Sequence, residues 1–238
     1  MLVLAHRGAS ADAPENTLAA FAEAVRQGAD GVELDAMVCG SGEVVVCHDA
    51  SLERLAGRAW TVARTDYSRL RLADVGSRLG YSPAQIPLLS DVVAALPAHF
   101  ILNIELKCDG TEDLGLAVKV GRLVTELGVA GRVVLSSFNA LCLFRLAAAY
   151  PTLRRGYLLD PGHSFALHAG LVAPLVSNHS IHPPDVWCDR ARVEGWRARG
   201  WSPYVWTVDD GARARELAGW GVSGCITNRP GALRRALT

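Results

Sequence analysis

The chain has 238 residues and a mass of 25.4 kDa, and its 24 lysines and arginines balance its 24 aspartates and glutamates. Half of the residues are hydrophobic and only 20% are charged, which excludes a disordered or collagen-like chain. A net charge of zero argues against a dedicated nucleic-acid binder, because such proteins usually carry a basic excess. The length suits one α/β barrel of about 250 residues. We therefore expect a single catalytic domain over residues 1–238.

The cysteines and the N-terminus bear on where the protein works. The six cysteines form no C-x-x-C pair, which indicates neither a thiol redox motif nor a structural zinc site. The N-terminal residues lack the basic start and the apolar run of about 7–15 residues that mark a signal peptide. No run of about 18 apolar residues predicts a membrane span. We expect a soluble, cytoplasmic protein whose cysteines are reduced.

Short apolar runs alternate with helical patterns along the chain. A first strand is predicted at residues 2–5, a helix at 17–27, a second strand at 31–36 and an extended segment at 43–47. Asn16 is a candidate N-cap for the first helix, and Gly28 a candidate stop. Later strands are predicted at residues 101–106, 133–136, 156–159, 175–177, 204–208 and 224–227. The helices that accompany them are predicted at residues 89–96, 114–127, 140–150, 190–199, 211–220 and 231–237.

Repeated strand–helix alternation predicts βα units and a parallel sheet. Eight units fit if the segment at 43–47 is a hairpin extension of the second strand, so we expect an eight-stranded parallel (β/α)8 TIM barrel. A doubly wound open sheet is the alternative, because residues 158–180 show no clean period. The stretch at about 49–87 is too long for a simple connection, and its composition predicts a small folded insertion after the second βα region.

Titratable side chains gather where the predicted strands end. Glu33 and Asp35 are two residues apart, as are Glu105 and Lys107, so each pair shares one face of its strand. In an α/β barrel these strand ends meet at the catalytic mouth. The side chains expected to converge there are His6, Arg7, Glu33, Asp35, His48, Glu105 and Lys107.

Each of these residues taken alone has an ordinary alternative role. An acidic residue at a strand end is commonly a helix cap or a solvated side chain, and His48 could be a loop histidine. Glu33 and Glu105, however, lie between apolar neighbours, where an ionised carboxylate is costly unless it is paired or metal-bound. Together with Asp35 they offer hard oxygen ligands, which predicts one divalent cation, Mg²⁺ or Ca²⁺.

Two histidines beside a hard cation indicate general acid and base catalysis, because imidazole titrates near neutral pH. Arg7 and Lys107 are cations that would hold an anionic substrate, for which phosphate is the usual match. These residues predict metal-assisted attack on a phosphoryl group, without naming the substrate.

The motifs resemble those of the glycerophosphodiester phosphodiesterases. They follow the family order over nearly the whole chain: HRGAS at residues 6–10, PENT at 14–17, GVELD at 31–35, VVVCHD at 44–49, IPLL at 86–89, NIELK at 103–107, SSF at 136–138, VWTVD at 205–209 and GCITNRP at 224–230. Asn228 departs from the pattern, since the family often has Asp there. The segment at 52–57 also differs from the family's usual insertion sequence, which leaves the leaving-alcohol preference open.

This resemblance implies a TIM barrel that hydrolyses a small glycerophosphodiester to sn-glycerol 3-phosphate and an alcohol. The neighbouring glycerol hydroxyl would attack phosphorus to give a cyclic phosphate, which water would then open. The residues implied are a cation site of Glu33, Asp35 and Glu105, an acid–base pair of His6 and His48, and phosphate contacts from Arg7 and Lys107. Which histidine acts as acid, the choice of cation and the oligomeric state stay open.

The sequence offers further candidate pocket residues and leaves two alternative functions open. Trp206 would either stack on the substrate glycerol or serve packing. Glu15 and Asn16 could hydrogen-bond near the pocket, and Ser136 and His182 are candidate pocket residues. The same constellation could act on a lysophospholipid, as a lysophospholipase D does, or it could belong to a barrel that binds a phosphodiester without turnover.

Overall fold

The computed structural model describes residues 1–108, 110–160, 162, 164 and 168–238. In this part of the chain eight parallel strands close into a barrel. The barrel closes because β1 pairs with β9 on one side and with β2 on the other. The strands are β1 (Leu2–His6), β2 (Gly31–Val38), β4 (Ile101–Leu106), β5 (Val133–Ser137), β6 (Arg155–Leu158), β7 (Ser180–His182), β8 (Ser202–Val205) and β9 (Gly224–Thr227). The expected TIM barrel is confirmed, and the open sheet is excluded.

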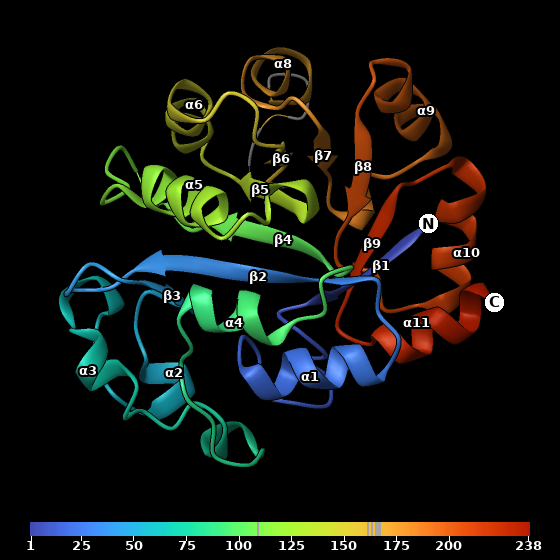
Figure 1. Cartoon of the computed structure of the whole chain (residues 1–238). Helices are drawn as coiled ribbons and strands as arrows, with labels where there is room; N and C mark the ends of the chain where they lie inside the picture. Colours follow the sequence, from blue (N-terminus) through green and yellow to red (C-terminus); the bar gives the residue numbers. More distant parts are fainter. Residues whose placement is uncertain (109, 161, 163, 165–167) are drawn as a thin grey trace.

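Helices surround the barrel, as Figure 1 shows. They are α1 (Leu18–Arg26), α4 (Leu89–Ala95), α5 (Leu116–Glu126), α6 (Ala140–Ala149), α8 (Ala173–Val176), α9 (Arg190–Ala198), α10 (Gly211–Trp220) and α11 (Pro230–Leu237). Each longer helix turns an apolar stripe toward the strands; α1, for example, buries Ala20, Phe21 and Ala24. Burial of a side chain such as Phe21 stabilises the fold by roughly 1.5–3 kcal/mol. None of the described helices is both long and apolar enough to cross a bilayer.

The start of α1 differs from the prediction. Thr17, not Asn16, is the N-cap: its side-chain oxygen accepts a hydrogen bond from the backbone N–H of Ala20 at 3.3 Å. Asn16 has a positive φ of 57°, and its side chain is directed to Asp35 in the barrel instead. Gly28, with φ of 74°, follows the end of the helix as expected.

The predicted strand at residues 175–177 is wrong. Residues Ala173–Val176 form α8, and the strand of this βα unit is β7, Ser180–His182. β7 is only three residues long and two of them are polar, so it presents no apolar run in the sequence. Ser180 Oγ and His182 Nε2 lie 2.8 Å apart, and this internal hydrogen bond allows both polar side chains to be buried.

Residues 49–87 pack against the side of the barrel. A short strand, β3 (Val44–Val46), pairs antiparallel with β2, which confirms the hairpin extension. Beyond it come α2 (Glu53–Ala56) and α3 (Tyr67–Leu70), which lie beside this hairpin in Figure 1. Leu52, Leu55, Val62 and Leu70 form an apolar cluster with residues of the hairpin, separate from the main core. This cluster fixes the segment that begins with Asp49 at the rim of the barrel.

Candidate active site

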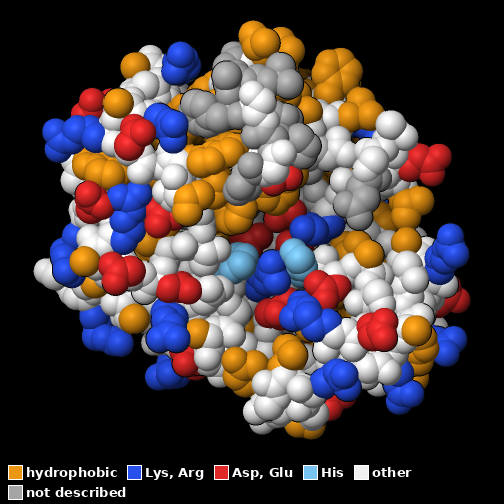
Figure 2. Space-filling model, turned by 180° about the vertical axis from the view of Figure 1, so that it is seen from behind, with side chains coloured by type: hydrophobic (Ala, Val, Ile, Leu, Met, Phe, Trp, Pro, Cys, Tyr) orange, Lys and Arg blue, Asp and Glu red, His pale blue; other side chains and the backbone are white. Residues whose placement is uncertain are grey.

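The predicted site residues meet at the mouth of the barrel, where β1 and β4 end: Glu33 and Asp35 lie within β2, which continues beyond the mouth to Val38, while His48 follows β3 and Trp206 follows β8. Strand register places His6 beside Glu33 and Asp35 beside Glu105. A cavity of about 310 Å³ opens there, and its lining includes His6, Arg7, Glu33, His48, Glu105, Lys107 and Trp206. Asp35 is 1% exposed and does not line the cavity. Figure 2 shows a hollow with histidine side chains at its centre, acidic and basic side chains around them, and hydrophobic side chains along one side.

Three carboxylates form a buried cluster in this site. Oxygen atoms of Glu33, Asp35 and Glu105 all lie within 4.8 Å of one another. Burial raises the pKa of Glu33 well above its usual value, and the negative charges of Asp35 and Glu105 raise it further. Burial and the charge of Asp35 likewise raise the pKa of Glu105 to about 7. Three carboxylates in one buried place repel one another, and a shared cation would relieve that repulsion.

Asn16 fixes the most buried of these carboxylates. Its side-chain N–H donates to Asp35 Oδ2 at 2.8 Å, and its side-chain oxygen accepts from the backbone N–H of Asp35 at 3.2 Å. Asn16 adopts a positive φ of 57°, and its side chain meets Asp35 within β2. The hydrogen bonding that was expected of Asn16 near the pocket is therefore present, in place of a cap.

The donor set fits a hard divalent cation. Carboxylate oxygens are the ligands that Mg²⁺ and Ca²⁺ prefer. The side-chain oxygen of Asn103 is buried, has no hydrogen-bond partner among the described residues, and belongs to a residue that lines the same cavity. The amide nitrogen of Asn103 donates to Ser136 Oγ at 2.8 Å, which holds that side chain in place. An unsatisfied buried acceptor beside three carboxylates indicates a site built for a water, a cation or a substrate hydroxyl.

Two cations border the cluster. Lys107 Nζ lies 2.9 Å from Glu105 Oε1 and 3.8 Å from Asp35 Oδ1. Arg7 has a positive φ of 55°, and its backbone N–H donates to Glu33 Oε2 at 3.1 Å. Burial alone would lower the pKa of each cation, but the neighbouring carboxylates outweigh burial and raise both pKa values. Both side chains therefore stay charged at the edge of the cavity.

His6 is oriented by Asn228. The side-chain nitrogen of Asn228 donates to Asp209 at 2.7 Å, so the side-chain oxygen of Asn228 faces His6 Nδ1, also at 2.7 Å. His6 Nδ1 must then carry the proton, while Nε2 lies 3.9 Å from Glu33 Oε2. Burial, with the positive charge of Arg7, lowers the pKa of His6.

His48 is oriented differently, by a carboxylate. His48 Nδ1 lies 2.7 Å from Asp49 Oδ1, and Arg54 donates to both oxygens of Asp49, at 2.6 and 3.1 Å. Burial alone would raise the pKa of Asp49, but the hydrogen bonds from Arg54 and His48 lower it to about 2. The other end of the Arg54 guanidinium donates to Glu15, which also accepts from Arg7. A continuous ion-pair chain thus links the two sides of the cavity.

The remaining candidates divide between the cavity and the core. Trp206 lines the cavity, packs edge-on against Phe138 with ring centroids 5.6 Å apart, and donates from its indole N–H to the carbonyl of His182. Ser136 also lines the cavity, as expected. His182 does not: it is fully buried against Ser180, and burial lowers its pKa to about 3.

Sequence reasoning did not single out Asn103, Phe138, Arg54 or Asp209. Asn103 had a usable signal, because it stands two residues before Glu105 and shares its face of the strand. Phe138 follows directly after the end of β5, where a barrel places pocket residues. No pattern in the sequence pointed to Arg54, because only the packing of the insertion brings it to its two carboxylate partners, Asp49 and Glu15.

Comparisons with known proteins agree over nearly the whole chain. The sequence model described as the Glycerophosphoryl diester phosphodiesterase family matches residues 6–232. A glycerophosphodiester phosphodiesterase of Caldanaerobacter subterraneus subsp. tengcongensis is 32% identical over 232 residues, covering 96% of this chain and 94% of that protein.

The fold of the chain also matches solved structures of phosphodiesterases. A phosphodiesterase of Oleispira antarctica, in complex with the product sn-glycerol-3-phosphate, superposes with a TM-score of 0.87 and 28% identity, covering 100% of this chain and 96% of that one. A glycerophosphodiester phosphodiesterase of Agrobacterium tumefaciens gives a TM-score of 0.84 and 29% identity, covering 99% of each chain.

Proposed function

Since the chain belongs to the glycerophosphoryl diester phosphodiesterase family, we propose that it hydrolyses glycerophosphodiesters to sn-glycerol 3-phosphate and an alcohol. The observation that carries this proposal is one cavity lined by two separately oriented histidines above a buried carboxylate cluster. The product complex of the Oleispira antarctica phosphodiesterase, which shares this fold, supports the choice of product.

We propose that Glu33, Asp35 and Glu105 together hold one divalent cation, Mg²⁺ or Ca²⁺. Such an ion, when bound, lowers the pKa of a nearby hydroxyl and offsets charge on the phosphoryl oxygens. The raised pKa values of Glu33 and Glu105 support this assignment, because burial and the charges of the neighbouring carboxylates make the ionised forms costly, and a bound cation would offset that cost. Asn16 would keep Asp35 in its ligating orientation through the hydrogen bonds described above.

His6 and His48 would move the protons. One histidine takes the proton from the glycerol hydroxyl as its oxygen attacks phosphorus, and the other gives a proton to the oxygen of the leaving alcohol. Water then opens the resulting cyclic phosphate while the two histidines exchange roles. This assignment is supported by geometry: the Nδ1 atoms of both rings are engaged, by Asn228 and by Asp49, so each ring keeps Nε2 for the substrate.

Arg7 and Lys107 would bind the phosphate group and stabilise the charge that builds on it. Both cations lie at the cavity edge and are held by carboxylates, so they are oriented before a substrate arrives. Trp206 would contact the glycerol carbons with the ring that its hydrogen bond to the His182 carbonyl holds in place.

The test is release of glycerol 3-phosphate from glycerophosphocholine in the presence of EDTA, Mg²⁺ or Ca²⁺. The variant Glu33→Gln should lose cation-dependent turnover, whereas Glu126→Gln, an exposed change on α5, should keep it. His6→Ala and His48→Ala should each lower kcat by about 10²-fold or more, the usual scale of acid–base catalysis. Near-normal turnover by Glu33→Gln, or by either histidine variant, would remove that residue from the mechanism.

The apolar part of the cavity lining favours a test of a second substrate class. The apolar side chains of Phe138, Leu158 and Ile226 are among those that line the cavity. Long-chain lysophosphatidylcholine should therefore be assayed beside glycerophosphocholine. Higher kcat/KM for the lysolipid would assign the site to lysophospholipids, and cation-dependent binding of either compound without product would indicate a binding barrel.

A further inference from the structure

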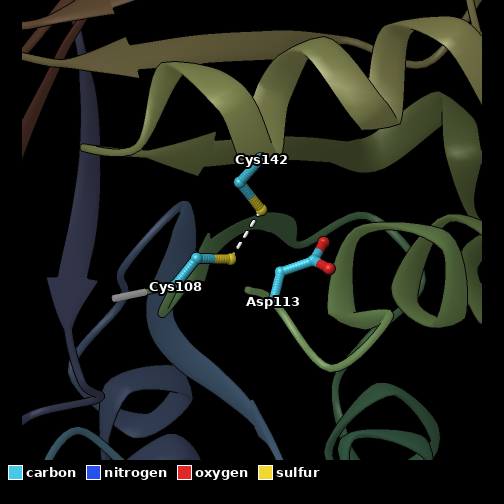
Figure 3. A group of neighbouring side chains, drawn as sticks. All are labelled: Cys108, Asp113 and Cys142. Atoms are coloured by element: carbon cyan, nitrogen blue, oxygen red, sulfur yellow. Dashed lines mark hydrogen bonds between the residues drawn. The ribbon is translucent and has the colours of Figure 1, made fainter. Parts of the chain in front are cut away.

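Two cysteines outside the proposed active site lie almost within bonding distance. Cys108 comes directly after Lys107 at the end of β4, and Cys142 lies in the first turn of α6. Their sulfur atoms are 2.6 Å apart, although 34 positions separate the residues in the chain (Figure 3). Closing this gap to a covalent bond needs a movement of only about 0.5 Å, because a disulfide bond is about 2.05 Å long.

A third side chain, Asp113, lies beside the two sulfurs, which raises the alternative of a metal site. Its carboxylate is already engaged: it accepts from the backbone N–H of Gly115 at 3.1 Å and pairs with Arg145 at 3.4 Å. One carboxylate oxygen of Asp113 lies within 4.8 Å of both sulfurs, to one side of the sulfur pair in Figure 3. Two thiols are fewer than the four ligands of a structural zinc site. The arrangement therefore favours a bond between the sulfurs over a shared ion.

We propose that Cys108 and Cys142 form a reversible intramolecular disulfide that ties the end of β4 to α6. A low-molecular-weight disulfide is a sufficient oxidant. The thiolate of Cys108 attacks one of its sulfurs, which gives a mixed disulfide and releases one small thiolate. The sulfur of Cys142 then attacks that of Cys108 and releases the second. The two protons from the cysteines end on the two small thiols, so the oxidant gains the two electrons that the protein loses.

The order of attack follows from exposure. Cys108 is partly exposed and Cys142 is buried, so the small disulfide can reach only the former. The hydrogen bond with Cys108, together with burial, raises the pKa of Cys142, so Cys142 is the less reactive thiol until the mixed disulfide on Cys108 removes that hydrogen bond.

The cross-link should stabilise the protein without stopping turnover. The end of β4 is already held toward α6, because Ser137 Oγ donates to the carbonyl of Leu106 at 2.8 Å and Asn139 donates to that of Cys108 at 3.2 Å. The bond therefore fixes an arrangement that exists and leaves the pairing of Lys107 unchanged. A closed loop of about 35 residues should raise Tm by roughly 8–15 °C.

The experiment exposes the reduced full-length protein to glutathione buffers of increasing oxidised fraction, followed by alkylation and peptide mass spectrometry without reduction. We expect one linkage, Cys108 to Cys142, with four of the six cysteines left as thiols. The oxidised protein should show the raised Tm and kcat within about twofold of the reduced protein, and dithiothreitol should reverse the change.

Variants test the order of attack. Cys142→Ser should stop at a mixed disulfide on Cys108, which adds one glutathione to the mass, whereas Cys108→Ser should leave Cys142 unmodified in the native protein. Neither variant should show the rise in Tm. Three results would overturn the proposal. The first is no linkage in fully oxidised buffer, and the second is a linkage that involves another of the six cysteines. The third is resistance of both thiols to alkylation that disappears when a chelator is added, which would indicate a bound metal ion.

Discussion

The carboxylate beside His48 provides a sharp test of the proposed mechanism, through the variant Asp49→Asn. In the wild-type protein Asp49 accepts from His48 Nδ1 with one oxygen, while Arg54 donates to both of its oxygens. An amide has a single oxygen, and Arg54 can only donate. The new Asn should therefore turn its oxygen to Arg54 and its N–H₂ group to the imidazole.

This reversal should change the tautomer of the histidine. An N–H₂ group facing Nδ1 requires Nδ1 to be unprotonated, which moves the ring proton to Nε2, the atom proposed to act on the substrate. Loss of a residue that orients a functional group commonly costs about 10–100-fold, and an inverted catalytic histidine costs up to about 10⁴-fold. We expect kcat to fall by about 10²- to 10³-fold, which raises the barrier by roughly 2.7–4 kcal/mol.

A double variant separates tautomer inversion from simple loss of charge. In Asp49→Asn/Arg54→Met the amide oxygen is free to face His48 again, because the competing donor is gone. The double variant should be at least about 10-fold faster than Asp49→Asn, while Arg54→Met alone should lose less than about 10-fold. Steady-state kinetics of the four proteins give the answer, and thermal unfolding checks that each is folded. A double variant that is no faster than Asp49→Asn would refute the tautomer reasoning.

Three further predictions concern the cation site and His6. Asn16→Gly keeps the backbone free to adopt a positive φ but removes the amide that holds Asp35, so the cation concentration giving half-maximal activity should rise about 10–100-fold, and an unchanged value would contradict that role. In cation-free protein, burial raises the folded-state pKa of Glu105 to about 7 from its ordinary 4.5, so the free energy of unfolding should fall as pH rises from 4.5 to 7. Urea titrations should show a smaller decrease of the free energy of unfolding with pH in Glu105→Gln or in saturating Mg²⁺. The same pH dependence in these cases would contradict the role of Glu105. Asn228→Asp places a carboxylate against His6 Nδ1, so NMR titration should show the pKa of His6 raised by roughly one unit, and no rise would disprove the contact.

The local pattern of the sequence was sufficient to predict most of the barrel. Strands such as Ile101–Leu106 and Gly224–Thr227 are buried on both faces, so each appears in the sequence as a short apolar run with the predicted bounds. The prediction failed at Ser180–His182, since that strand is stable through an internal hydrogen bond and pairing with two neighbours rather than through apolar residues.

The sequence alone also determined which residues reach the mouth of the barrel, because position at a strand end and a spacing of two residues are local properties. What supports those residues depends on segments far apart in the chain. Asn228 meets His6 across 222 positions and Arg54 meets Glu15 across 39, and neither contact leaves a trace in local spacing. Barrel closure and the packing of the insertion decide these contacts, as they decide that Cys108 faces Cys142. Periodicity therefore specifies the elements and the reactive groups, and only the tertiary structure specifies which partner orients each group.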